Sequence, residues 1–285
     1  MAEEHINREV KDRLFKFIFG NAEHKEFTLS LYNAINGTSY TTANGFEITS
    51  IENAIYMSMH NDLSFIVADT MNLYEQQSTY NPNMPLRMLC YTGMLYSKFL
   101  KENLLEEKMF NSSLVAIPCP KLIVFYNGER KQPNRAILKL SNSFNEGVKS
   151  DIEVKVTMLN VNYGRNKKLM EKCKPLSDYS LFVFGMRKWK SEGLDAAEAV
   201  DRAIEALSDD SEVKKLILLH KAEVAQMFLF EYNEEGVMNA LKEEAMEIGK
   251  AEGKTEVAKA MLAKGIDVDT VSQCSGISVD ELKRL

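Results

Sequence analysis

One apolar run constrains the fold of this chain more than any other segment. The stretch KLIVFYNG, residues 121–128, is almost continuously apolar until it reaches the turn signal Asn127-Gly128. Such a run is typical of a β-strand that is covered on both of its faces. The segment therefore predicts a sheet that lies inside the protein.

The surrounding segments alternate between helical and extended patterns. We expect helices over residues 7–36, broken at Gly20-Asn21 and ending at Asn36-Gly37. Further expected elements are a strand over 46–56, a hairpin of strands over 62–67 and 71–77, a long amphipathic helix over 86–108, a strand over 153–161 and helices from Lys167 onward. This order predicts an α/β fold with a central mixed sheet flanked by helices.

The last third of the chain has a different character. We divide the sequence into a main domain over 1–235, a charged helical linker over 236–254 and a small helical unit over 255–285. Gly249 and Gly253 lie inside the linker's helical pattern, where each costs roughly 1 kcal/mol relative to alanine.

In the small C-terminal unit, Gly265 is expected to end a helix, and Ser278 with Glu281 forms a capping-box pattern. A helix-turn-helix DNA reader fits this outline. A unit for oligomerisation or docking fits it equally well, because the segment is acidic and its last helix is short. The C-terminal helices could thus support a homo-oligomer.

Composition limits the classes of protein that remain. Apolar residues make up 45% of 285 residues, which is enough for a real core. The four cysteines lie far apart without zinc-site spacing, as in a reducing cytosol. The charged N-terminus has no signal-peptide pattern, and no apolar run approaches the roughly 20 residues of a membrane span. We expect a soluble cytoplasmic protein that does not enter a membrane.

A basic segment stands out against the formal net charge of −6. Residues 164–190 hold eight basic side chains against Glu171 and Asp178. Their positive field favours a polyanion such as DNA, bound through its phosphates with weak sequence specificity. A solvated helix face is the alternative. The predicted DNA-binding residues here are Arg165, Lys167, Lys168, Lys172, Lys174, Arg187, Lys188 and Lys190.

The predicted hairpin carries unexpected polar residues. Glu75 and Gln77 are two positions apart and so share one face of their strand. A turn at Ala68-Asp69 places Asp62 opposite Glu75, whereas a turn at Asp69-Thr70 places Asp62 opposite Gln77. Directly opposed Cβ atoms are roughly 4.5–5.5 Å apart. Two carboxylates at this distance stay ionised when a cation lies between them, and Mg²⁺ suits such ligands.

The chain resembles a known family at several motifs. These are the hairpin pattern D-x(12)-E-x-Q, the segment NPNMPLR that follows it, and D-x-x-F-K-x-x-F-G near the N-terminus. Together they are similar to the recombination-promoting nuclease (Rpn) family of transposase-like proteins in the PD-(D/E)xK superfamily. The resemblance covers about residues 8–235 well and implies a restriction-endonuclease-like core with an all-helical C-terminal extension.

The resemblance also implies roles for individual residues. Asp62 and Glu75 would bind Mg²⁺, with Mn²⁺ as the alternative ion. Gln77 stands where the wider superfamily usually has lysine, so another group has to stabilise the attacking hydroxide. Lys16 is a candidate for a relocated lysine, with Asp12 one helical turn before it. The alternative for Asp12 and Lys16 is a surface ion pair.

These observations predict a Mg²⁺-dependent DNA endonuclease that hydrolyses phosphodiester bonds. Arg87 could contact phosphate, or it could be a helix-surface arginine that packs on the sheet edge. The rival function is a nuclease fold with little or no catalytic activity that acts as a DNA- or protein-binding regulatory module. The intact pair of acids favours the enzyme, and the acidic C-terminal region mildly favours the rival.

Overall fold

The computed structural model describes residues 14–41, 47–49, 63–67 and 69–282. Asp12 and Asp62, both predicted site residues, lie outside the described residues, as does most of the expected strand over 46–56. Contacts divide the chain into two units, Met1–Glu231 and Tyr232–Leu285. Each unit is described by itself.

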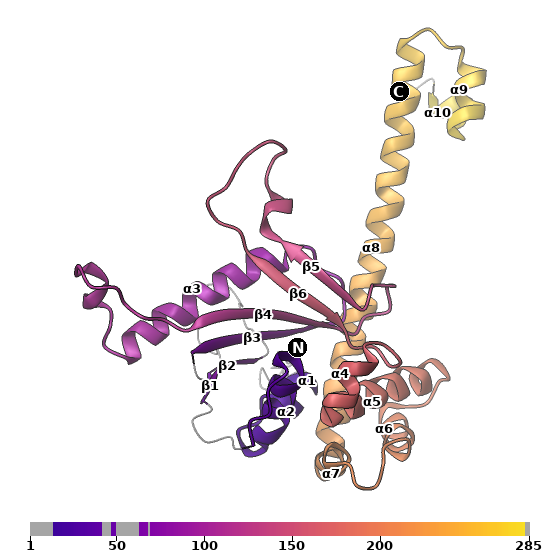
Figure 1. Cartoon of the computed structure of the whole chain (residues 1–285). Coiled ribbons are helices and arrows are strands. Elements are labelled where there is room, and N and C mark those ends of the chain that lie inside the picture. Colours follow the sequence, from indigo (N-terminus) through magenta and orange to yellow (C-terminus); the bar gives the residue numbers. More distant parts are fainter. Residues whose placement is uncertain (1–13, 42–46, 50–62, 68, 283–285) are drawn as a thin grey trace, which may run out of the picture. The chain divides into compact units, whose positions relative to one another are not determined.

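A mixed sheet forms the centre of the first unit (Figure 1). Its strand order is β1-β2-β3-β4-β6-β5. The neighbours β3, β4 and β6 run parallel, and the outer pairs are antiparallel. The strands are β1 (Glu47–Thr49), β2 (Leu63–Val67), β3 (Thr70–Gln77), β4 (Cys119–Tyr126), β5 (Arg135–Lys139) and β6 (Lys155–Asn160). The predicted α/β class with a central mixed sheet is confirmed.

The hairpin of β2 and β3 follows one of the two predicted registers. Val67 pairs with Thr70 and Leu63 pairs with Tyr74, so two positions, 68 and 69, connect the strands. This is the register expected for a turn at Ala68-Asp69. The alternative turn at Asp69-Thr70 is wrong, because Thr70 already belongs to β3.

Two local predictions are corrected by the structure. The long helix α3 runs from Met84 to Glu102, and a separate 3₁₀ turn, η3 (Glu107–Phe110), follows it. It thus ends before residue 108 because Leu104 takes a positive φ of 55°, a conformation that breaks a right-handed helix. Strand β5 was not predicted. It lies at the edge of the sheet, and its sequence RAILK has three adjacent apolar residues in place of an alternation of polar and apolar types.

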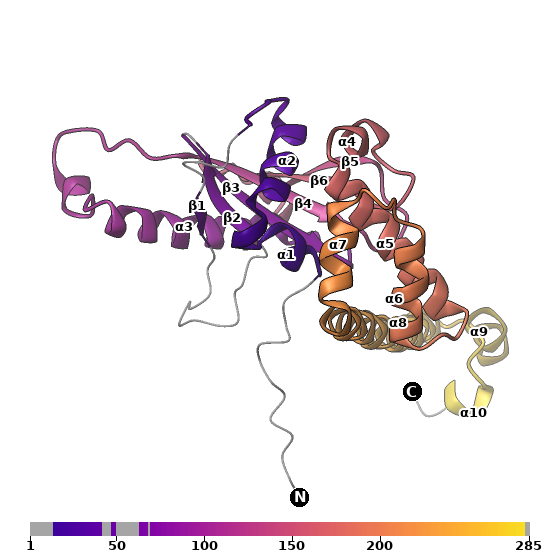
Figure 2. The same ribbon diagram turned by 90° about the horizontal axis from the view of Figure 1, so that it is seen from below.

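Helices cover the two faces of the sheet unequally. Helices α1 (Leu14–Phe19) and α2 (Lys25–Asn36) pack on one face, which we call the α2 face. Helix α3 covers the other, the α3 face, through side chains spaced three or four residues apart. Figure 1 shows α3 on one side of the strands and α1 and α2 on the other, and Figure 2 shows α1 and α2 from their own side.

Further helices extend the core of the α2 face. They are α4 (Lys167–Lys172), α5 (Lys174–Ser191), α6 (Ala196–Glu205), α7 (Glu212–Leu219) and the first turns of α8 (Lys221–Ala263). Helices α5 and α6 approach closely at Gly185, where an added Cβ would lie 3.1 Å from the Cβ of Ala203. One apolar cluster links these helices to α1, α2 and the sheet.

The second unit contains the end of α8 followed by α9 (Val268–Ser275) and α10 (Val279–Leu282). Gly265 and Gly276 both take a positive φ after a helix, as expected for C-caps. The predicted capping box is confirmed, since the backbone N–H of Glu281 donates to Ser278 Oγ and that of Ser278 donates to Glu281 Oε2, both at 3.3 Å. None of the described helices is long and apolar enough to cross a membrane.

Candidate active site and nucleic-acid interface

Glu75 is a buried carboxylate on the α3 face. It is 1% exposed and lies near the end of β3, among the apolar side chains that α3 covers. Arg87, in the first turns of α3, donates from Nη2 to Glu75 Oε1 at 2.6 Å. The same guanidinium donates to the hydroxyl of Tyr91 at 2.8 Å. A buried charge is tolerated when it is paired and hydrogen-bonded in this way.

Gln77 lies beside Glu75 as the two-residue spacing predicts. Its Nε2 donates to Glu75 Oε1 at 3.2 Å. One carboxylate oxygen thus accepts from both a guanidinium and a side-chain amide. Carboxylate and amide oxygens are hard ligands of the kind that Mg²⁺ binds, so the chemistry of these side chains fits this ion. Among the described residues, no group of three or more His, Cys, Asp or Glu side chains gathers in metal-binding geometry.

Lys16 occupies a different position. It lies on α1, whose buried side chains Leu14, Phe15, Ile18 and Phe19 belong to the core of the α2 face. The structure therefore brings Glu75, Gln77 and Arg87 together, while the helix of Lys16 covers the opposite face of the sheet. Asp12 and Asp62 lie outside the described residues.

A hydrogen-bonded network closes the carboxyl ends of the parallel strands. Gln76 Nε2 donates to Asn127 Oδ1 at 2.6 Å, and Asn127 Nδ2 donates to the Tyr179 hydroxyl at 2.8 Å. Arg187 donates from Nη1 to the carbonyl of Asn127. The chain also passes closely here, because a Cβ on Gly128 would lie 1.8 Å from the carbonyl oxygen of Ser78. The network joins β3 and β4 to α5.

The predicted DNA-binding residues separate into groups. Lys174 forms an ion pair with the buried Asp178 at 3.1 Å, and Lys190 donates to the carbonyl of Leu194 at 3.0 Å. Both contacts are local to α5 and the residues that directly follow it. Lys188 lies 4.6 Å from the ring centroid of Trp189. The other predicted residues either are exposed near α4 or line two cavities; they are Arg165, Lys167, Lys168, Lys172 and Arg187.

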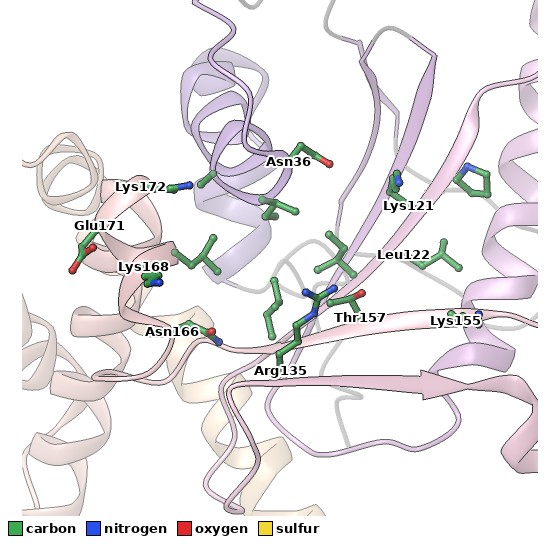
Figure 3. Close-up of a pocket in the computed structure, with 16 residues that line it drawn as sticks. Asn36, Lys121, Leu122, Arg135, Lys155, Thr157, Asn166, Lys168, Glu171 and Lys172 are labelled. Carbon is green, nitrogen blue, oxygen red and sulfur yellow. The ribbon is translucent and has the colours of Figure 1, made fainter.

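The larger cavity is a basic cleft of about 860 Å³ on the α2 face (Figure 3). Its floor is formed by β4, β5 and β6, and its walls by the end of α2 and by α4. Five basic side chains and a single acid, Glu171, line it. The basic residues are Lys121, Arg135, Lys155, Lys168 and Lys172. The cleft lies on the face opposite to Glu75, because its floor residue Ile123 belongs to the α2-face core.

Sequence reasoning identified Lys168 and Lys172 but missed the three basic residues of the sheet. Lys121, Arg135 and Lys155 come from three strands that are separated in sequence. Their side chains meet only because β4, β6 and β5 are neighbours. The alternation of polar and apolar residues in KVTM, residues 155–158, was the one local signal that a face of β6 is polar.

Comparison with known proteins agrees with the sequence resemblance. Residues 251–285 match the C-terminal HTH domain of the Rpn/YhgA-like nuclease family. Neither the curated proteins nor the solved structures contain a significant match. The matched HTH domain supports DNA binding. The match covers only this C-terminal segment, and it supports an assignment of the protein to the Rpn/YhgA-like nuclease family.

Proposed function

We propose that this member of the nuclease family is a metal-dependent endonuclease that hydrolyses phosphodiester bonds in DNA. The observation that carries the proposal is Glu75, a buried carboxylate that shares a strand face with Gln77. The hairpin register is the one for which the sequence predicts Asp62 opposite Glu75. A core position of this kind would otherwise favour an apolar side chain.

In this proposal, Glu75 and Asp62 hold Mg²⁺ or Mn²⁺. When bound, such an ion polarises the scissile phosphate and lowers the pKa of a water molecule. Arg87 would stabilise negative charge that develops on the phosphate. Gln77 orients the attacking water or a phosphate oxygen through its amide. Lys16 has no role in this proposal, because its helix covers the opposite face of the sheet.

DNA is held by separate elements in this proposal. The HTH domain contributes one binding site, and the basic residues around the sheet contribute contacts to the backbone. Arg165, in the loop after β6, and Arg187, on α5, are the predicted contacts at the end of the sheet where β3 carries Gln77. Phosphate contacts position DNA without reading its sequence, so weak specificity is expected from this part of the protein.

Nicking of supercoiled plasmid tests the proposal directly. We expect Mg²⁺-dependent nicking by the parent protein and none by Glu75→Gln or Asp62→Asn. Glu102→Gln is the matched control, because Glu102 is an exposed acid at the far end of α3, 3.8 Å from Lys98. Equal nicking by Glu75→Gln and the parent would sink the proposed site.

The pairing of Glu75 with Arg87 also favours a second candidate function. A carboxylate already neutralised by a guanidinium at 2.6 Å needs no metal ion for its burial. A family member that kept this arrangement could bind DNA without cutting it. Calorimetric titration with Mn²⁺ separates the two functions, since the binding-only protein would show no heat that depends on Glu75.

A further inference from the structure

The second cavity lies beyond the carboxyl ends of β4 and β6. It has a volume of about 370 Å³ and is bounded by the loops that follow these strands and by one side of α5. The volume is within the range of roughly 300–1,000 Å³ that small-ligand sites occupy. Ligands commonly bind beyond the carboxyl ends of parallel strands in open α/β sheets. The place and the size both suit a small ligand.

The loops around this pocket are fixed by side-chain amides. Asn162 Nδ2 donates to the carbonyl of Gly128 at 3.0 Å, and Asn160 Nδ2 donates to the carbonyl of Gln132 at 3.0 Å. Asn166 Nδ2 donates to the carbonyl of Asn134 at 2.6 Å. These bonds tie the loop after β4 to the loop after β6. A pocket held in this way needs little reorganisation when a ligand binds.

Positive charge dominates the rim of the pocket. Four basic residues line it, against the single acid Glu129. Arg165 and Lys131 are exposed, and Arg187 is half-buried at the strand-end network. The guanidinium of Arg130 lies 5.6 Å from the ring centroid of Tyr80. Such a rim attracts an anion, and arginine is well suited to phosphate.

Two exposed aromatic side chains stack at the same pocket. Tyr163, in the loop after β6, and Phe184, on α5, have ring centroids 5.1 Å apart and planes inclined by 27°. They are 56% and 49% exposed. Aromatic surfaces beside a basic groove are the usual platform on which single-stranded nucleic acid stacks its bases.

A buried hydroxyl supplies an independent sign of a ligand. Ser180 lines the pocket from α5 and is 4% exposed. Within the described part of the chain, its Oγ has no hydrogen-bond partner. Buried hydroxyls normally have one, because an unmade bond is costly. A polar group of a ligand in the pocket would provide it.

We infer that this pocket binds one unpaired nucleotide of a DNA strand. The base stacks on Tyr163 and Phe184, a polar edge bonds to Ser180 Oγ, and the adjoining phosphate lies against Arg165 and Arg187. The pocket and the candidate active site share a strand end, since the backbone N–H of Asn127, one of the pocket residues, donates to the carbonyl of Gln77 at 3.1 Å. The inference rests on the proposed nuclease function and names its substrate class: DNA that contains unpaired nucleotides.

Binding measured without cleavage tests the inference. The full-length protein is titrated in EDTA against a fluorescent single-stranded oligonucleotide and against a blunt duplex of the same length. We expect tighter binding to the single strand. Tyr163→Ala and Phe184→Ala should each weaken single-strand binding by about 10- to 100-fold and leave duplex binding unchanged. Tyr163→Phe should bind like the parent, because it keeps the stacking surface.

Two further variants separate recognition from folding. Phe110→Ala removes an exposed aromatic side chain, 87% exposed and outside the pocket, and should change neither affinity. Ser180→Ala removes the unpartnered hydroxyl, so it should weaken single-strand binding without lowering the melting temperature. Unchanged single-strand binding by both Tyr163→Ala and Phe184→Ala overturns the inference, as does an equal loss for single strand and duplex.

The same experiments distinguish this inference from the proposed function. If the pocket variants bind single strands normally while the parent nicks plasmid, the pocket assignment fails and the nuclease stands. If the parent neither binds nor nicks any DNA, the nuclease itself fails. Deoxythymidine monophosphate is titrated as a free nucleotide. Suppose that the free nucleotide binds, that Phe184→Ala abolishes this binding, and that oligonucleotide binding is unchanged. This result would overturn the assignment of the pocket to a nucleotide within a DNA strand.

Discussion

Two regions of the first unit bury a carboxylate, and they do so for different reasons. Asp178, in the helical layer, is 3% exposed and accepts from Ser211 at 2.6 Å and pairs with Lys174 at 3.1 Å. Ser211 also caps α7. Every partner of Asp178 named here lies on α5 or at the start of α7, so the acid joins two helices.

Glu75 has a different set of neighbours. Its partners are Gln77 on its own strand and Arg87 on α3, and Arg87 keeps 32% of its side chain exposed. The carboxylate joins a strand to a helix that apolar contacts already hold. A buried acid therefore does not by itself indicate an active site. The nature of its partners, and the cost of replacing it, separate a structural acid from a functional one.

We expect the largest effects from replacing the two acids, with activity lost at Glu75 and stability lost at Asp178. Glu75→Gln should reduce nicking to background and cost about 1 kcal/mol of stability, because Arg87 keeps its bond to Tyr91. Asp178→Asn should retain nicking per folded molecule and cost about 2–4 kcal/mol. Urea unfolding and plasmid nicking measure both quantities. Full activity of Glu75→Gln, or inactivity of well-folded Asp178→Asn, would break the distinction.

Removing the positive charge of Arg87 tests whether Glu75 can bind a metal ion. Arg87→Ala removes the guanidinium from a buried carboxylate and should destabilise the metal-free protein by about 2–3 kcal/mol, a value reduced by the partial exposure of Arg87. Mn²⁺ should restore part of the loss by binding the folded state. Thermal melting with and without Mn²⁺ gives the answer. A loss that Mn²⁺ does not relieve would favour a purely structural pair.

The cap between α5 and α7 should respond more weakly. Ser211→Ala removes the bond to Asp178 and the acceptor for the N–H of Lys214 at 3.0 Å. We expect a loss of about 1–2 kcal/mol in unfolding free energy and no change in DNA binding. Ser211→Thr, which keeps the hydroxyl, is the control. A change in DNA affinity would show that Asp178 has a role beyond stabilising the fold.

The basic cleft on the α2 face provides a further test, of whether its lysines contact DNA phosphates. Charge reversal at Lys168 and Lys172, together with the exposed neighbour Lys167, should flatten the salt dependence of DNA binding by about one unit of slope for each lost phosphate contact. Lys101→Glu, on the distant end of α3, is the control. An unchanged slope would show that these residues form only a solvated face.

The smallest effect concerns a thiol next to the helical layer. Burial raises the pKa of Cys173 to about 11, with the negative charge of Asp178 as a minor further cause. The folded protein keeps this proton between pH 9 and 11, where the unfolded chain loses it, so its contribution to stability falls as the pH rises through that window. At pH 8, iodoacetamide should modify the exposed Cys119 and Cys274 but not Cys173.

The sequence alone determined the elements with strong local signals. The run KLIVFYNG is buried on both faces from Ile123 onward, because the strand lies at the centre of the sheet. The two-residue spacing placed Glu75 and Gln77 on one face, since side chains of a strand alternate. The capping box and the glycine caps followed from bonds within a few residues of each other.

Tertiary structure decided which charged residues meet. Arg87 could have contacted solvent or phosphate, and only the packing of α3 on the sheet brings its guanidinium to Glu75. The basic segment read as one patch, yet its side chains divide between a cleft, a pocket and contacts within helices. Periodicity gives the direction of a side chain relative to its own element. The partner depends on how distant elements pack, which local sequence does not encode.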